Sequence, residues 1–293
     1  MASTIRNPVE WGAEQIKAAS RHLGLVGETL AGEEAGAHPV LPQIRQITLD
    51  DLQEVLKLGM ADFAACRTDV AFLCIIYPIA GLCLSWFALD RDLLPLLFPV
   101  VSGFALVGPV AAVGLYEMSR RRERGEKANW ASAFGVIASP SFGAIFVLGL
   151  LLVVVFVVWV LMAHGIYNAT LGPEPPASIG AFAHDVLTTA AGWEMIAVGV
   201  LVGFVFAVIT LSASAVSFPL LLDRKVGIPV AIMTSVRAVA RNPWTFAVWG
   251  MIVTGGLVIG SLPVFLGLIV VMPVLGHATW HLYRRVVSPP EKG

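Results

Sequence analysis

Two histidines near the C-terminus are the residues of this sequence best placed to do chemistry. His277 and His281 stand four residues apart in the stretch GHATWHLYRR. On a helix they share one face about 6 Å apart, which suits a shared metal, and imidazole is also a common axial ligand of haem. The alternative is that both are interfacial polar residues that bond to neighbouring helices. A zinc site needs further ligands that spacing does not identify, so we predict no metal ligand set and leave the cofactor unknown.

The remaining sequence contains no recognisable catalytic motif. It has no nucleophile elbow, phosphate-binding glycine loop, HExxH motif or pair of carboxylates within an apolar stretch. The cores of the apolar stretches carry no ionisable residue, which argues against proton-coupled transport. Cys66, Cys74 and Cys83 form no CxxC pair. We therefore expect a protein that is not an enzyme, and its net charge of −1 gives no indication of a nucleic-acid partner.

The elements that carry these residues are predicted to be transmembrane helices. Hydrophobic residues make up 57% of the chain and charged residues 13%, about half the usual charged share of a soluble domain, and the mean hydropathy is +0.81. The apolar residues also occur in runs long enough to cross a bilayer as helices. The sequence thus predicts an all-α membrane protein with six spans, at 70–89, 93–116, 141–163, 193–222, 244–262 and 263–283.

The distribution of basic residues predicts the orientation of these spans. All Lys and Arg residues except Arg91 fall in the N-terminal segment, the loops 120–127 and 224–241, or the C-terminal tail. Because basic residues are enriched on the cytoplasmic side, both chain ends are expected there. The expected location is the bacterial inner membrane, with several passes through the bilayer.

A threefold repeat organises the predicted spans into hairpins. Each of three hairpins follows a short amphipathic helix on the cytoplasmic side, which indicates a pseudo-threefold arrangement. Thr48 is placed to cap the first of these helices, Ser139-Pro140 ends the second, and Pro229 and Asn242-Pro243 bound the third. The predicted apolar face of the first helix consists of Leu49, Leu52, Val55, Leu56, Met60 and Phe63.

Three domains follow from this organisation. Residues 1–47 form a cytoplasmic arm and linker, in which Trp11 belongs to an apolar stripe. Residues 48–287 form the six-helix membrane domain, and 288–293 form a cytoplasmic tail. The outer loop contains an amphipathic piece around Phe182 that is expected to lie on the membrane or to contact a partner.

The chain resembles an uncharacterised family of bacterial integral membrane proteins. The resemblance rests on TIRNPVEW near the start, on DLQEVLKLGMADF with ACRTD, and on the terminal PVLGHATWHLYRR, and it covers about residues 40–287. The last motif is the most specific. The resemblance implies a membrane protein with an accessory or assembly role beside a respiratory complex.

Three functions are compatible with these observations. The first is an accessory or assembly protein bound to a larger membrane complex, with the bilayer and that complex as partners. The second is a transporter or channel for a small solute, which would use a polar seam of Thr210, Ser212, Ser214 and Ser217. The third is a haem- or metal-handling protein that uses His277 and His281. We favour the first, with a partner expected to contact Trp11, Phe63, Glu117, Arg120, Phe182, Trp280 and Arg284.

Overall fold

The computed structural model describes residues 41–66, 74–90 and 93–289. Trp11 and the rest of the arm through residue 40 lie outside the described residues. In the described part every named element is helical, and the one β feature is an isolated antiparallel bridge between Ile44 and Val287. The all-helical class predicted from the sequence is therefore confirmed for this part of the chain.

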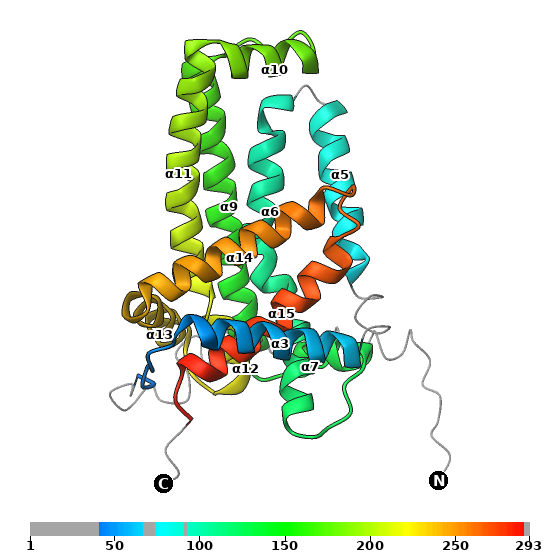
Figure 1. Ribbon diagram of the computed structural model, residues 1–293, viewed down its shortest axis with the longest axis vertical. Helices are drawn as coiled ribbons and strands as arrows, with labels where there is room; N and C mark the ends of the chain where they lie inside the picture. The colour runs from blue at the N-terminus through cyan, green and yellow to red at the C-terminus, as the bar shows by residue number, and fades with distance from the viewer. Residues whose placement is uncertain (1–40, 67–73, 91–92, 290–293) are drawn as a thin grey trace.

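Two long antiparallel helices, α9 (Phe142–Thr170) and α11 (Ala190–Ser214), stand upright side by side (Figure 1). We call this pair the upright hairpin. Helix α10 (Ile179–Thr188) lies across its end, and the hydroxyls of Ser178 and Thr189 cap the starts of α10 and α11. Below α11 the chain continues as α12 (Ser217–Asp223).

A second, shorter pair of helices stands beside the upright hairpin (Figure 1). It consists of α5 (Ile76–Asp90) and α6 (Leu97–Ala111), with the short turn η1 (Leu94–Leu96) before α6. Helix α6 packs on α9, and the indole nitrogen of Trp159 donates to the carbonyl of Pro99 at 2.9 Å. Helix α6 ends with Ala112 as its C-cap, and the next helix, α7 (Val113–Glu123), contains more polar residues than α6.

The end of the molecule opposite α10 is a layer of helices that we call the basal layer (Figure 1). Its members are α7, α12, the second half of α15, α3 (Leu49–Ala65), α8 (Trp130–Ala133), η2 (Phe134–Ala138) and α13 (Ile228–Arg241). Local sequence chemistry sets several of its boundaries. Thr48 and Asp51 form a capping box at the start of α3, Pro229 lies in the first turn of α13, and Asn242 ends α13.

The last two helices, α14 (Pro243–Ser261) and α15 (Leu268–Val286), form an oblique hairpin (Figure 1). Val264 and Phe265 in the turn between them have positive φ angles of 54° and 63°. The second half of α15 descends into the basal layer and packs along α3. The predicted sixth span at 263–283 therefore falls partly on this turn and partly on a helix of the basal layer.

Three helical stretches are long and apolar enough to cross a membrane: Phe142–Thr170, Ala190–Asp223 and Pro243–Ser261. Ile76–Trp86 and Leu94–Gly103 are shorter apolar helices. Length and composition thus support three of the six predicted spans in the described residues, and the other three stay predictions. Helix α15 is not among these three stretches. Its second half contains His277, His281 and two arginines, so it is less apolar than the predicted sixth span requires.

Several of the largest fully buried side chains lie in the basal layer, namely Trp280, Tyr116, Tyr283 and Phe218. A strap at 43–48 joins this core to the C-terminus, since Arg45 N donates to Val286 O at 2.8 Å and Ser288 N donates to Gln43 O at 3.0 Å. The basal layer is consequently the region that fixes the positions of the functional candidates.

Candidate functional site

The motif GHATWHLYRR lies at the contact between α15 and α3, where the two helices approach closely. A Cβ on Gly59 would lie 2.8 Å from both the Cβ and the backbone nitrogen of Ala278. Small residues allow such an approach because nothing separates the two backbones. The buried face of α3 consists of Leu52, Val55, Gly59 and Asp62. It is rotated from the predicted face, since Leu49 and Met60 are exposed.

A buried carboxylate, Asp62, collects side chains from α7 and α15. Its Oδ2 accepts a hydrogen bond from Ser119 Oγ at 2.6 Å and lies 2.9 Å from His281 Nε2. Its Oδ1 accepts from Arg122 Nε at 2.8 Å. Because Asp62 is only 6% exposed, these donors replace the water that an ionised carboxylate requires.

His277 extends this group, which we call the Asp62 cluster: Asp62, Ser119, Arg122, His277 and His281. His277 Nδ1 lies 2.8 Å from Ser119 Oγ, and both residues are fully buried. Since the ionised carboxylate can only accept, the Ser119 hydroxyl donates to Asp62 and His277 Nδ1–H donates to that hydroxyl. Among the described residues, His277 Nε2 has no hydrogen-bond partner.

The order of donors in the Asp62 cluster differs from that of a catalytic triad. In a triad the histidine accepts the proton of the serine hydroxyl and so activates the nucleophile. Here the hydroxyl of Ser119 gives its proton to Asp62, and His277 is a donor to the same oxygen. The arrangement joins α3, α7 and α15 but does not prepare a nucleophile.

The electrostatics of the Asp62 cluster favour the charged form of Asp62 and the neutral form of His277. Burial raises the pKa of Asp62, but hydrogen bonds from His281, Ser119 and Arg122 outweigh burial and bring this pKa to about 2. The pKa of His277 is lowered from 6.5 to about 4, mainly by burial and also by the neighbouring His281 and Arg122, against the attraction of Asp62. His277 lies in the basal layer, outside the three candidate spans.

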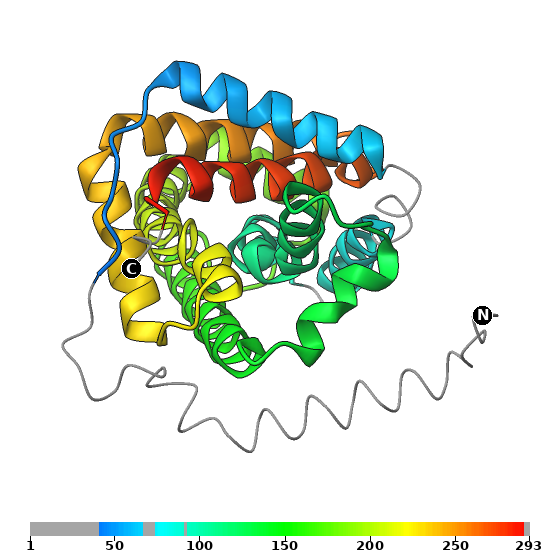
Figure 2. The same cartoon turned by 90° about the horizontal axis from the view of Figure 1, so that it is seen from below.

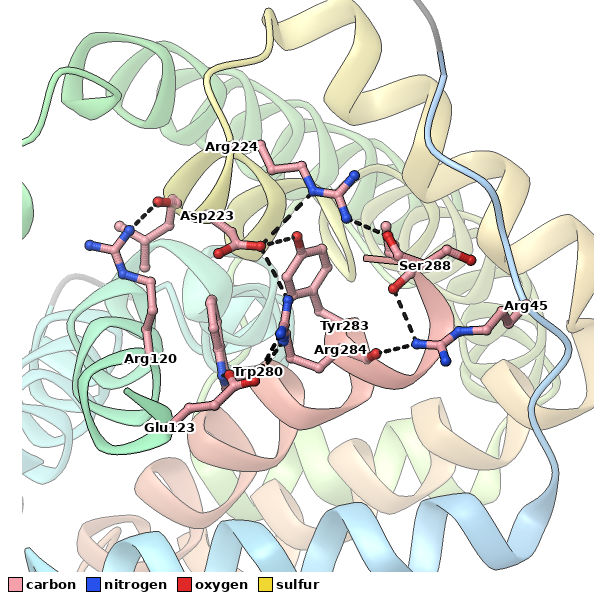
Figure 3. Close-up of polar contacts among 11 residues, drawn as sticks. Arg45, Arg120, Glu123, Asp223, Arg224, Trp280, Tyr283, Arg284 and Ser288 are labelled. Carbon is pink, nitrogen blue, oxygen red and sulfur yellow. Dashed lines mark hydrogen bonds and ion pairs between the residues drawn. The ribbon is translucent and has the colours of Figure 1, made fainter. Parts of the chain in front are cut away.

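The next turns of α15 bind two more carboxylates, as Figure 3 shows. Glu123 Oε2 accepts from the Trp280 indole at 3.0 Å, and its Oε1 lies 2.9 Å from Arg284. Asp223 Oδ2 accepts from the Tyr283 hydroxyl at 2.7 Å. Helix α15 is thereby connected to α7 through Glu123 and to α12 through Asp223.

The strap at 43–48 and Ser288, which follows α15, join the same network (Figure 3). Arg45 Nη2 donates to the carbonyl of Arg284 at 2.7 Å, and Arg224 donates to the carbonyl of Ser288. Arg285 pairs with Asp51 and with Glu54 on α3. Nearly every polar side chain of the terminal motif is therefore bonded within the chain.

The predicted partner-contacting residues fall into different settings. Glu117 is 3% exposed and pairs with Arg120 at 2.6 Å and with Arg121 at 2.7 Å, not with His281. Arg120 also donates to the carbonyl of Leu222 at 2.6 Å. Trp280 is 1% exposed and Arg284 is paired, so both contact the chain itself in this structure.

Two aromatic candidates lie at opposite ends of the molecule. Phe63 is half-buried on α3 and packs against the core. Phe182 lies on α10, and its ring meets that of Tyr167 edge-on with centroids 6.3 Å apart. The structure thus places these two residues on the two helices that flank the apolar body, one on the basal layer and one at the other end.

The polar seam predicted on α11 and α12 is partly bonded within the chain, and the buried Thr210 Oγ1 has no hydrogen-bond partner among the described residues. Ser214 Oγ donates to the carbonyl of Thr210 at 2.7 Å, and Ser217 Oγ donates to carbonyls of Ala213 and Ala231. Such bonds satisfy hydroxyls inside a helix without a solute.

Sequence reasoning missed Asp62, Ser119 and Arg122. A signal for Asp62 was present, because a carboxylate at position 62 continues the helical stripe of Leu52, Val55 and Gly59 and so faces the core. No comparable pattern marked Ser119 or Arg122. In the described residues, no group of three or more His, Cys, Asp or Glu side chains is placed to hold a metal ion.

The fold and the site together define an all-helical integral membrane protein with a polar-bonded layer at one end. Residues 97–223 match a family model described as "Predicted integral membrane protein (DUF2189)". Over these residues the match confirms the resemblance to a membrane family of unknown function. The three motifs that suggested this resemblance lie outside the matched segment. No curated protein and no solved structure gives a significant match to the chain.

Proposed function

We propose that this protein is an accessory or assembly protein of the bacterial inner membrane, which associates with a larger membrane complex and performs no catalysis itself. Both chain ends face the cytoplasm in this proposal, as the basic residues indicate. The observation that carries it is a strip of apolar side chains on α3 that the rest of the chain covers only in part.

The outer strip of α3 consists of Leu49, Leu56, Met60 and Phe63, and it lies beside the face that α15 covers. Leu49 is 48% exposed and Met60 is 50% exposed, while Leu56 and Phe63 are half-buried. Figure 2 shows α3 at the outer edge of the basal layer. An exposed apolar strip of this kind is typical of a surface that docks a partner helix.

The strip is held in a fixed position, which favours binding. Asp62 bonds to His281 and Asp51 pairs with Arg285, so the polar side of α3 is fixed to α15. The capping box at Thr48 fixes the start of α3 itself. A surface that is already ordered loses less conformational entropy on association. Most of the terminal motif is used for this internal bonding, which supports a structural role for His281 rather than a cofactor role.

The proposal retains three hairpins, each preceded by a helix of the basal layer. They are α5 with α6, α9 with α11, and α14 with the first half of α15. The third hairpin is oblique (Figure 1). The respiratory complex implied by the resemblance is the first partner to test.

The test is purification of the tagged full-length protein in a mild detergent, followed by mass spectrometry of the proteins that accompany it. We expect a stoichiometric set of membrane-complex subunits with the wild-type chain. The double variant Leu49→Gln/Met60→Gln should lose them while it remains folded. The matched control Met233→Gln/Val236→Gln changes two similarly exposed apolar residues of α13 and should retain them. A wild-type protein that purifies alone would contradict the proposal.

A further inference from the structure

We propose that Arg237 and Arg241 of α13 form a binding site for the phosphate headgroup of an anionic phospholipid. This inference goes beyond the proposed function and does not depend on it. The two arginines are four residues apart, so they lie on one face of the helix. Both are exposed, and in the described residues neither guanidinium has a hydrogen bond or an ion pair.

Arg237 and Arg241 differ in this respect from the arginines that lie between the helices of the basal layer. Those that lie between its helices are bonded to carboxylates or backbone carbonyls within the chain, namely Arg45, Arg120, Arg121, Arg122, Arg224, Arg284 and Arg285. Helices α13 and α14 contain no Asp or Glu at all. Like charges at this spacing repel, so the pair at Arg237 and Arg241 weakens α13 unless an anion lies between them.

A hollow beside these two side chains gives the anion a place. Its volume is about 300 Å³, and it is lined by Ile44, Arg237, Ala240 and Arg241. This size is at the lower end of the range for small-molecule sites. Ala240 leaves the space open, and the guanidinium groups can bind phosphate oxygens in a bidentate manner.

The position of α13 makes a lipid the source of the phosphate. The helix runs through Asn242 directly into α14, which is one of the three candidate spans. Trp244 in the first turn of α14 is 69% exposed, and an exposed tryptophan at the start of a span is typical of the headgroup region. Arg241 lies three residues before it, at the level where anionic headgroups attract basic residues.

The exposed apolar residues of α13 support the same placement. Met233 is 51% exposed and Val236 is 40% exposed. An amphipathic helix with apolar residues beside arginines lies in the membrane interface, where the apolar side chains contact acyl chains. Figure 2 shows α13 at the periphery of the basal layer, with the segment from residue 41 alongside it. The site is therefore open to the surrounding lipid.

The experiment measures binding of phosphatidylglycerol to the full-length protein in mild detergent by native mass spectrometry, with phosphatidylcholine as the comparison lipid. The variant Arg237→Gln/Arg241→Gln should lose about thirtyfold in affinity for phosphatidylglycerol, because it removes two basic side chains that attract the anionic headgroup. Phosphatidylcholine binding should not change. The control Lys57→Gln/Arg124→Gln removes the same charge from two exposed residues elsewhere and should bind as the wild type does.

Three results would overturn the proposal. The first is equal loss of phosphatidylglycerol in the control variant, which would indicate general electrostatic attraction. The second is displacement of the lipid by millimolar inorganic phosphate, which would indicate a free-anion site. The third is unchanged affinity in the Arg237→Gln/Arg241→Gln variant. Circular dichroism of each variant establishes that it is folded.

Discussion

The upright hairpin and the basal layer are held together by different forces. In the most apolar stretch of Ala190–Asp223 only 6% of the residues are buried within the chain, so packing against other helices contributes little there. In the basal layer, Asp62, Glu123 and Asp223 each bind donors from other helices. Lipid tails are as apolar as leucine and do not distinguish one helix arrangement from another, whereas hydrogen bonds have direction. The comparison indicates that the basal layer specifies the tertiary structure.

The largest difference between the two regions is expected on removal of a carboxylate. Asp62→Ala leaves the buried Ser119 and the half-buried Arg122 and His281 without their acceptor and should lower the free energy of unfolding by about 3 kcal/mol. Asp185→Ala on α10 removes a carboxylate whose side chain is 53% exposed and should change it by less than about 0.5 kcal/mol. Denaturant unfolding in detergent micelles measures both, and equal effects would remove the distinction between the regions.

Lowering the pH should destabilise mainly the basal layer. Unfolded His277 takes up a proton below pH 6.5, but folded His277 does so only near pH 4, so stability falls by on the order of 3 kcal/mol as pH drops through this interval. Asp62 adds a further loss between pH 3.8 and about 2, because the unfolded carboxyl is protonated first.

Unfolding at pH 7 and at pH 4.5 measures this acid sensitivity. His277→Gln should show a smaller difference between the two pH values than the wild type, whereas His164→Gln on α9 should show the wild-type difference. An unchanged pH dependence in His277→Gln would exclude His277 as its source.

Replacing a glycine by alanine should change the stability of the protein in opposite directions in the two regions. Gly59→Ala places a methyl group against the backbone of Ala278 and should destabilise the protein by about 1–3 kcal/mol. Gly199→Ala on α11 meets open space and should be neutral or stabilise by up to about 1 kcal/mol, since alanine favours the helix. Thermal unfolding of the two variants tests the sign directly, and a stabilised Gly59→Ala would show that α3 and α15 are not in close contact.

The smallest difference in stability is expected between two tyrosine-to-phenylalanine variants, one in each region. Tyr283→Phe removes a bond to the carboxylate of Asp223 and should cost about 1.5 kcal/mol. Tyr167→Phe removes a bond to the backbone carbonyl of Glu174 and should cost about 0.5 kcal/mol. Thermal unfolding of the single variants, with Tyr283→Phe/Asp223→Asn as a coupled pair, checks whether the larger loss belongs to this bond.

The sequence predicts the parts of this structure that local chemistry determines. Thr48, Pro229 and Asn242 mark helix boundaries because capping and proline effects act within one turn. Hydropathy likewise finds α9 and α11. The oblique course of α14 and α15 could not be predicted, because it depends on contacts between residues more than two hundred positions apart, such as Asp62 with His281.

The candidate site was predicted only in part for the same reason. His277 and His281 are recognisable as a pair, but their partners Ser119 and Asp62 come from other helices. The predicted apolar face of α3 omits Gly59 and Asp62, because neither side chain is apolar, and the buried face is rotated toward these two residues. Their burial is explained by the close approach of α15, which only the tertiary structure shows.

The most direct test of the central claim is hydrogen–deuterium exchange of the full-length protein in detergent, with wild type, Asp62→Asn and Asp185→Asn compared. If the Asp62 cluster holds the basal layer as one unit, Asp62→Asn should lose amide protection together in α3, α7 and the second half of α15, while α9 keeps its protection. Asp185→Asn should match the wild type throughout. Loss confined to α3, or equal loss in α9, would contradict the claim.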